Sequence, residues 1–271
     1  MTEAASRSMK KPKSETADFL GFLLKLAIFV FVLRSFIFAP FSIPSESMLP
    51  RLMVGDYLLV AKWPYGYSRH SLPWSVPLIS GRVFSHLPAR GDVVVFKAPP
   101  GNRTDYIKRV IGLPGDLIQV KSGQVMLNGT PIPKVRVADF VAPASPNSPC
   151  FSPDFTERAS DGTERCRYPQ FRETLPGGRS YNVLDLGPTE ADDTPVYTVP
   201  ADDLFLMGDD RDRSADSRFA AMEGGGIGMV PVENLVGRAM VSVFSTDGSA
   251  NWFLPWTWVS AARWRRIGEQ F

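Results

Sequence analysis

The chain has 271 residues, enough to bury the core of one or two domains. Its composition, 44% apolar and 21% charged, is that of a globular protein and excludes a disordered chain. The formal net charge is only +2, whereas a nucleic-acid-binding protein usually carries a strongly basic surface, so no nucleic-acid partner is predicted. His70 and His86 are the only histidines, which leaves a His-based triad or a His-rich zinc site poorly supplied.

An apolar segment at residues 19–40 follows a polar, basic segment at residues 1–18. At a rise of about 1.5 Å per residue, it can cross the roughly 30 Å hydrocarbon core of a bilayer. Its charges, Lys25 and Arg34, lie within about two turns of its ends, where long side chains reach the interface. A cleavable signal peptide is the alternative. The apolar region of a signal peptide would be shorter, and its cleavage site would need small residues where this chain has Phe36 and Phe38.

The basic residues predict how this segment is oriented. They precede it, and the next one after Arg34 is Arg51. The positive-inside rule therefore places the N-terminus in the cytoplasm and the chain from about residue 41 on the far side of the membrane. We interpret residues 1–18 as a cytoplasmic tail and residues 19–40 as a permanent single-pass anchor.

Beyond the anchor, the chain is predicted to be mainly β, with short antiparallel strands. Short apolar runs between Gly-, Pro- and Asp-containing turns predict strands at 54–62, 93–97, 105–112, 204–207 and 235–244. A hairpin is expected within residues 118–129, with Gly123 in its turn. We assign residues 41–132 and 201–250 to the two parts of one β domain. Residues 133–200 are an inserted β subdomain, and residues 251–271 are a C-terminal tail.

The only two cysteines, Cys150 and Cys166, lie in the inserted segment. An even pair in an exported domain favours a disulfide, and two buried free thiols are the alternative. A metal site would need more ligands than this pair supplies.

Two serines follow the anchor in a proline-bounded stretch. Ser45 and Ser47 lie between Pro44 and Pro50, which fix their own φ and bias the preceding residues toward extended backbone. The stretch is therefore a stiff, irregular turn. Such a turn can hold a nucleophile away from a regular strand, but taken alone it is more typical of a structural loop.

Lys108 lies in the middle of the strand predicted at 105–112. Because side chains alternate along a strand, either Lys108 or Arg109 must point toward the more buried side. Burial lowers the pKa of a lysine, which can then act as a general base near neutral pH. A solvated Lys–Arg pair on an edge strand is the alternative, and the strand by itself favours it.

Residues 207–218 interleave aspartates with arginines after a predicted strand. A calcium loop counted from Asp210 would need Gly at its sixth position and Glu at its twelfth, where this chain has Ala215 and Ala221. The pattern indicates an ion-pair bracket that holds a turn in place, with a solvated loop as the alternative.

Together and in this order, these segments closely resemble bacterial signal peptidase I (leader peptidase). The matching motifs are Ser-x-Ser-Met-x-Pro, the Gly-Asp strand opener, Arg-Gly-Asp-Val-Val-Val-Phe, Tyr-Ile-Lys-Arg-Val-Ile-Gly-Leu-Pro-Gly-Asp and Gly-Asp-x-Arg-Asp-x-Ser-x-Asp-Ser-Arg. The resemblance covers most of the chain outside 1–18, 63–89 and 133–200. It implies a serine endopeptidase, without metal or other cofactor, on the outer face of the bacterial cytoplasmic membrane. Its partners would be the lipid bilayer and preprotein signal peptides, which it would cleave after a small-x-small motif.

The resemblance also implies the catalytic roles. Ser47 would be the nucleophile and Lys108 its general base. Ser45 would supply a hydroxyl to the oxyanion hole beside the backbone N–H of Ser47. Serine needs a base within about 3 Å, and a neutral lysine suits a chain that is poor in histidine. Paired oxyanion donors are the usual means of stabilising a tetrahedral intermediate.

Other matched positions would support the site. Ser214 would hydrogen-bond to the Lys108 amine and orient it, while Asp216 and Arg218 would form an ion pair. Shallow apolar pockets for small side chains would be lined by Phe41, Ile43, Leu52 and Ile107.

Three flanking positions depart from the family pattern. Arg51 stands where Thr is common, and Asp210 and Arg213 stand where Asn is common. These departures leave the expected chemistry intact but change the charge of the supporting loop.

The C-terminal tail is rich in tryptophan and arginine. Its tryptophans are Trp252, Trp256, Trp258 and Trp264. Aromatic residues mixed with arginines are typical of a membrane-interface surface, and buried core aromatics are the alternative.

Three other functions compete with a general signal peptidase. A peptidase with one dedicated substrate belongs to the same family. An anchored β domain that only binds partners would keep Ser47 and Lys108 far apart, with Lys108 titrating like a free lysine. A soluble self-cleaving Ser/Lys regulator is disfavoured by the apolar segment and by the lack of a DNA-binding segment.

Overall fold

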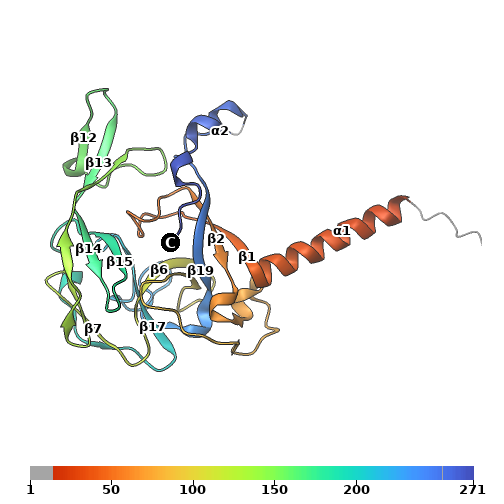
Figure 1. Ribbon diagram of the computed structural model, residues 1–271, viewed down its shortest axis with the longest axis horizontal. Helices are drawn as coiled ribbons and strands as arrows, with labels where there is room; N and C mark the ends of the chain where they lie inside the picture. The colour runs from red at the N-terminus through yellow and green to blue at the C-terminus, as the bar shows by residue number, and fades with distance from the viewer. Residues whose placement is uncertain (1–14, 252) are drawn as a thin grey trace, which may run out of the picture.

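The computed structural model describes residues 15–251 and 253–271, so most of the tail expected at 1–18, and Trp252, lie outside the described residues. One long helix projects from a body made of antiparallel sheets (Figure 1). The predicted fold class is therefore confirmed: the chain is mainly β, with one apolar helix at its N-terminal end.

The projecting helix, α1 (Glu15–Val32), has no buried residue and continues as a π-helix at Leu33–Ile37. Within the described part of the chain, Glu15–Ile37 is the one helix long and apolar enough to cross a membrane, with a mean hydropathy of 2.2. It ends at Ile37 rather than at residue 40. The reason is that β1 (Phe38–Ser42) already pairs with β2 (Asp56–Ala61), which joins the helix to the sheet without a linker.

The central sheet has seven strands in the order β1-β2-β19-β5-β6-β17-β18. Its remaining strands are β5 (Val93–Lys97), β6 (Asp105–Gly112), β17 (Asp203–Met207), β18 (Val230–Pro231) and β19 (Leu235–Ser245). The strands predicted at 93–97 and 105–112 have the expected bounds. The long strand β19 pairs with both β2 and β5, and so places the C-terminal half of the chain inside the sheet begun by the N-terminal half.

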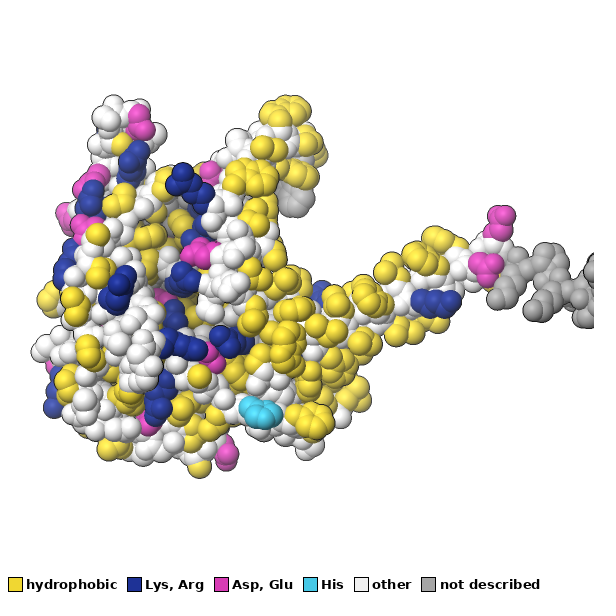
Figure 2. Space-filling view, viewed as in Figure 1, with side chains coloured by type: hydrophobic (Ala, Val, Ile, Leu, Met, Phe, Trp, Pro, Cys, Tyr) yellow, Lys and Arg dark blue, Asp and Glu magenta, His cyan; other side chains and the backbone are white. Residues whose placement is uncertain are grey.

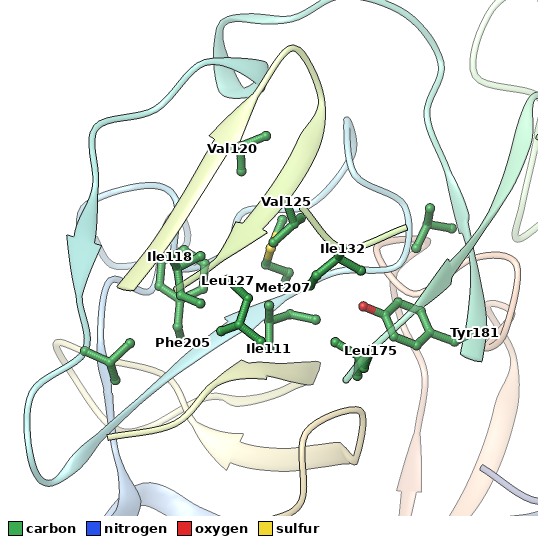
Figure 3. Packing of buried hydrophobic residues seen from close by; sticks show 12 residues of the cluster. Ile111, Ile118, Val120, Val125, Leu127, Ile132, Leu175, Tyr181, Phe205 and Met207 are labelled. Carbon is green, nitrogen blue, oxygen red and sulfur yellow. The ribbon is translucent and has the colours of Figure 1, made fainter. Parts of the chain in front are cut away.

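A second sheet, β16-β7-β8-β9, covers one side of the central sheet. Its strands are β7 (Leu117–Lys121), β8 (Gln124–Leu127), β9 (Thr130–Pro131) and β16 (Tyr197–Thr198). The predicted hairpin is β7–β8, and Gly123 in its turn has a φ of +72°. Apolar side chains of the hairpin, such as Ile118 and Leu127, pack against Ile111 and Phe205 of the central sheet (Figure 3).

The inserted segment forms two three-stranded sheets, as expected for a β subdomain (Figure 1). One contains β10 (Lys134–Arg136), β14 (Gln170–Thr174) and β15 (Ser180–Leu184), and the other contains β11 (Phe140–Pro143), β12 (Thr156–Arg158) and β13 (Glu164–Tyr168). A disulfide joins Cys150 to Cys166, which resolves the choice left open by the sequence.

Irregular structure fills the rest of the chain. The excursion at residues 63–89 contains β3 (Tyr67–Ser68) and β4 (Arg82–Val83), and the C-terminal tail contains the short helix α2 (Trp256–Ala261). Short 3₁₀ helices lie at Trp63–Tyr65, Arg69–Ser71, Pro73–Ser75, Pro153–Phe155, Glu190–Asp192, Val232–Asn234 and Trp264–Arg266.

Candidate active site

Ser47 and Lys108 are in direct contact. Their Oγ and Nζ atoms lie 2.5 Å apart in a hydrogen bond between residues 61 positions apart in the sequence. Both side chains are buried, at 6% and 4% exposed. Ser47 lies in the turn between β1 and β2, and Lys108 lies in the middle of β6. The structure therefore contradicts the binding-module alternative, which keeps these residues apart.

Burial changes the protonation of Lys108. Loss of hydration disfavours its charged form and lowers its pKa to about 8, although the nearby carboxylates of Asp216, Asp209 and Asp210 raise it in part. A lysine with this pKa is partly neutral near pH 8, whereas a solvated lysine is fully charged. The nitrogen can then accept a proton from the hydroxyl it contacts.

Arg109, the neighbour of Lys108, is also buried, at 5% exposed. Its Nε and Nη2 donate to both carboxylate oxygens of Asp209 at 2.7 and 2.6 Å, and its guanidinium lies 4.2 Å from the ring centroid of Tyr181. The alternative of a solvated Lys–Arg pair on an edge strand is therefore wrong: both residues are buried, β6 lies between β5 and β17, and the inserted segment covers the face that carries Arg109. Pairing with Asp209 offsets the cost of burying this charge.

The predicted ion-pair bracket at residues 207–218 is present. Arg218 donates to both oxygens of Asp216 from Nε and Nη2, at 2.9 and 3.0 Å, and Gly208 N–H also donates to this carboxylate at 3.1 Å. Arg211 forms a buried bidentate pair with Glu173 of β14. These pairs fix the loop from inside the protein and tie it to the inserted segment, so the solvated-loop alternative does not hold.

This loop packs tightly against the Ser47 turn. Asp210 N–H donates to the Ser47 carbonyl oxygen at 3.1 Å. A Cβ at Gly208 would overlap the Ser214 side chain and lie 2.5 Å from the same carbonyl oxygen. Only glycine leaves room for this close approach. The sequence analysis did not predict that Gly208 is needed for this close packing. The Gly-Asp pair directly after a predicted strand is the signal that could have indicated it.

Ser214 does not make the hydrogen bond expected from the sequence. It is buried, at 5% exposed, but its Oγ has no hydrogen-bond partner among the described residues. Its side chain packs against Gly208 instead, and the Lys108 amine bonds to Ser47. Ser214 thus lies beside the site without orienting the lysine in this structure.

Ser45 is exposed, and its Oγ lies 3.4 Å from the Oγ of Ser47. Both serines open onto a pocket of about 360 Å³ whose wall also includes Glu46 and Arg213. A carbonyl group entering this pocket would meet both hydroxyls.

The residues expected to line apolar pockets gather in one cluster. Ile43, Leu52 and Ile107 belong to it, and Phe41 packs against it. Leu52 has no exposed surface and Ile43 only 3%, and none of the four is among the residues that line the pocket beside Ser47. Ile107, at 9%, and the half-buried Phe41 are nearer the surface, but the expected apolar lining of the site is not seen in the pocket beside Ser47.

Sequence reasoning missed a charged group beside Ser47. Glu46 forms an ion pair with Arg213 and accepts a hydrogen bond from Ser148, which lies just before Cys150. The Arg213 guanidinium lies 4.5 Å from the ring centroid of Phe151. Burial raises the pKa of Asp210 to about 8. From the sequence, Asp210 and Arg213 are only departures from the family pattern, because a motif does not show which charges will meet in the folded protein.

Within residues 15–251 and 253–271, no group of three or more His, Cys, Asp or Glu side chains is arranged to hold a metal ion.

The fold and site define a mainly β protein with an apolar N-terminal helix and a buried Ser–Lys pair. The family described as "Signal peptidase, peptidase S26" matches residues 16–244. The chain is 35% identical over 255 residues to signal peptidase I of Rickettsia typhi, covering 91% of this chain and 85% of that protein. It is 36% identical over 224 residues to signal peptidase I of Rickettsia canadensis, covering 79% and 75%.

The chain therefore belongs to the signal peptidase I family, a family of serine endopeptidases, as its motifs predicted. It is also similar to the crystal structure of a signal peptidase I from Enterococcus faecalis, at 23% identity over 56% of this chain and 97% of that one. The TM-score of 0.29 for this pair is too low to establish a shared fold.

Proposed function

We propose that this chain is a membrane-anchored serine endopeptidase that removes N-terminal signal peptides from exported preproteins after a small-x-small motif. The observation that carries the proposal is the 2.5 Å contact between Ser47 Oγ and the buried Lys108 Nζ. Membership of the signal peptidase I family supports the same reaction class.

In this mechanism, neutral Lys108 removes the hydroxyl proton as Ser47 Oγ attacks the scissile carbonyl carbon. The Ser47 backbone N–H and the Ser45 hydroxyl donate to the oxyanion of the tetrahedral intermediate. The intermediate collapses when the Lys108 ammonium gives its proton to the leaving amine. Water, deprotonated by Lys108, then attacks the acyl-enzyme ester and releases Ser47.

The surroundings favour this cycle in two ways. Desolvation keeps Lys108 partly neutral before reaction, and the carboxylates of Asp216 and Asp209 stabilise the ammonium that forms during it. The apolar side chains of Phe41 and Ile107 would limit the adjoining subsites to small residues.

The anchor would place this site at the membrane surface. Ser47 is ten residues beyond the helix end at Ile37, so even a fully extended chain could carry it at most about 35 Å from that end. Five of these residues form β1. We propose that α1 spans the bacterial cytoplasmic membrane with its N-terminus in the cytoplasm. The catalytic domain then lies on the outer side, where a preprotein held by its own signal helix presents its cleavage site.

The test is cleavage of a generic preprotein by the detergent-solubilised full chain, alongside Ser47→Ala and Lys108→Ala. Ser42→Ala and Lys121→Ala serve as matched controls, because these exposed residues lie outside the site. We expect cleavage after a small residue that both site substitutions abolish and that both controls and a chelator leave intact. Activity that survives Ser47→Ala would remove the nucleophile assignment. No cleavage by the unmodified chain would favour a dedicated-substrate peptidase.

A further inference from the structure

A second pocket, separate from the one beside Ser47, lies at the end of the apolar helix. It has a volume of about 160 Å³ and is lined by the end of that helix, by β1, by Lys62 and the excursion at residues 63–89, and by one residue each of β5, β6 and β19. This volume corresponds to about five water molecules, which is room for a phosphate group. The titratable residues that line it are Arg34, Lys62, His70, Lys97 and Asp105.

Lys62 is the central cation of this pocket and is 4% exposed. Its Nζ donates to the Ser71 carbonyl oxygen at 3.3 Å and lies 5.8 Å from the ring centroid of Phe41. Among the described residues, no carboxylate lies within ion-pair distance of it. Burial lowers the pKa of Lys62 to about 8; the carboxylate of Asp105 raises it in part, and the neighbouring cations Lys97 and Arg34 lower it further. An anion bound here would supply the missing counter-charge.

The other charges of the pocket leave it positive. Lys97 forms a 3.0 Å ion pair with Asp105, so these two offset each other. Burial lowers the pKa of His70 to about 4, which leaves its ring neutral at pH 7. Arg34 and Lys62 therefore remain as uncompensated cations, and the pocket is complementary to a compact anion.

The position of the pocket indicates where that anion comes from. Tyr67 of the excursion donates its hydroxyl to the Phe36 carbonyl oxygen at 3.0 Å, which holds the excursion against the helix end. Trp74, which lines the pocket, is 92% exposed, and Leu78 and Phe84 of the same excursion are 76% and 78% exposed. Hydrophobic side chains gather around the base of α1 in Figure 2. Tryptophan beside basic residues is typical of the headgroup level of a membrane.

We infer that this pocket binds the phosphate group of a membrane phospholipid, with Arg34 and Lys62 as its cationic contacts and Trp74 placed among the adjoining lipids. The lipid would fix the height of the β domain above the bilayer. The inference rests on the proposed membrane insertion of α1, but it does not depend on the Ser47–Lys108 chemistry.

The experiment is native mass spectrometry of the full chain in detergent, which counts the lipids retained during titration with dioleoyl phosphatidylglycerol. Dioleoylglycerol, which lacks phosphate, and inorganic phosphate are titrated in parallel. We expect one saturable phosphatidylglycerol and no saturable binding of either fragment. Equal retention of dioleoylglycerol would overturn phosphate recognition, and equally tight binding of inorganic phosphate alone would overturn the lipid assignment.

Variants test the two cations. Lys62→Met and Arg34→Gln should each weaken phosphatidylglycerol binding by about tenfold, since each removes a charge-assisted contact. Lys121→Met, at an exposed lysine of β7, is the matched control and should bind as the unmodified chain does. Unchanged binding by both pocket variants would overturn the inference.

Two further controls make this outcome interpretable. The exposed Arg34 side chain can be replaced without a core change, so Arg34→Gln remains informative if Lys62→Met fails to fold. Ser47→Ala should retain the lipid even though it is expected to lose cleavage. Loss of lipid binding and loss of peptidase activity are therefore separable results.

Discussion

The backbone N–H of Asp210 donates a 3.1 Å hydrogen bond to the carbonyl oxygen of Ser47, and so joins the loop after β17 to the turn after β1. Lys108 reaches the same turn from β6 through its bond to the Ser47 hydroxyl. The candidate nucleophile is thus held at both its backbone and its side chain by segments far away in the sequence.

The pH dependence of cleavage should follow Lys108. Its pKa is lowered to about 8 by burial, and only the neutral amine can accept the Ser47 proton. We therefore expect kcat/KM to rise with pH and to reach half its plateau near pH 8, falling about tenfold per unit on the acid side. Steady-state cleavage of a peptide substrate between pH 6 and pH 10 measures this. A half-maximum near pH 10 would show that Lys108 titrates as a solvated lysine.

Lys108→Met should abolish cleavage and yet stabilise the fold at pH 7. A lysine whose pKa is lower in the folded than in the unfolded chain destabilises the protein wherever it is protonated in the unfolded chain. That penalty is largely present at pH 7 and disappears as the pH rises to about 10.5. The gain should be on the order of 1–3 kcal/mol in urea unfolding at pH 7. A less stable Lys108→Met variant at pH 7 would contradict a desolvated lysine.

Asp210→Asn should stabilise the protein increasingly from pH 4 to pH 8. Burial raises the pKa of Asp210 to about 8, and its Oδ1 lacks a hydrogen-bond partner among the described residues. The folded state therefore resists the ionisation that the unfolded chain undergoes near pH 4, and native stability falls across this range. Thermal unfolding of both proteins at pH 5 and pH 8 should show the larger difference at pH 8. An equal difference at both pH values would argue against the raised pKa.

Gly208→Ala should lower both stability and cleavage. The added Cβ would overlap Ser214 and press on the Ser47 carbonyl oxygen, which moves the nucleophile turn. Overpacking of this kind costs about 1–3 kcal/mol. The matched control is Gly101→Ala, because the nearest atom to a Cβ there is Glu223 Oε1 at 3.8 Å. Chemical denaturation and kcat/KM should separate the two variants, and equal behaviour would mean that the loop relaxes freely.

Replacing both Cys150 and Cys166 by Ala should destabilise the inserted segment. The disulfide closes a loop with a sequence separation of 16, for which the chain-entropy estimate is about 3 kcal/mol. Cys166 packs in the same buried cluster as Leu49 of the Ser47 turn, so cleavage should also fall. Unfolding midpoints and kcat/KM of the oxidised protein and the double variant test both effects. Lower stability with unchanged kcat/KM would show that this cluster does not position the turn.

The C-terminal tail is another feature that the structure clarifies. Trp256, Trp258 and Trp264 are 69%, 43% and 60% exposed, so these three are not core aromatics. The membrane-interface surface expected from their mixture with arginines stays a prediction.

The sequence by itself determined the elements of this protein. Apolar periodicity and Gly-Asp turns are local properties, and they predicted the strands at 93–97 and 105–112 and the β7–β8 hairpin. The apolar helix was predicted for the same reason, but its end was not. Phe38 leaves the helix because Ala61, much later in the chain, is its strand partner.

Only the tertiary structure decided which side chains meet. The Ser47 turn meets Lys108 even though β19 and β5 lie between β2 and β6 in the sheet, and the inserted segment covers Arg109 on the opposite face. The same packing gives Glu46 its partner Arg213 and leaves the Ser214 hydroxyl without one among the described residues. Hydrogen bonds and desolvation act over a few ångströms in space, so a sequence reveals them only once the fold has brought distant residues together.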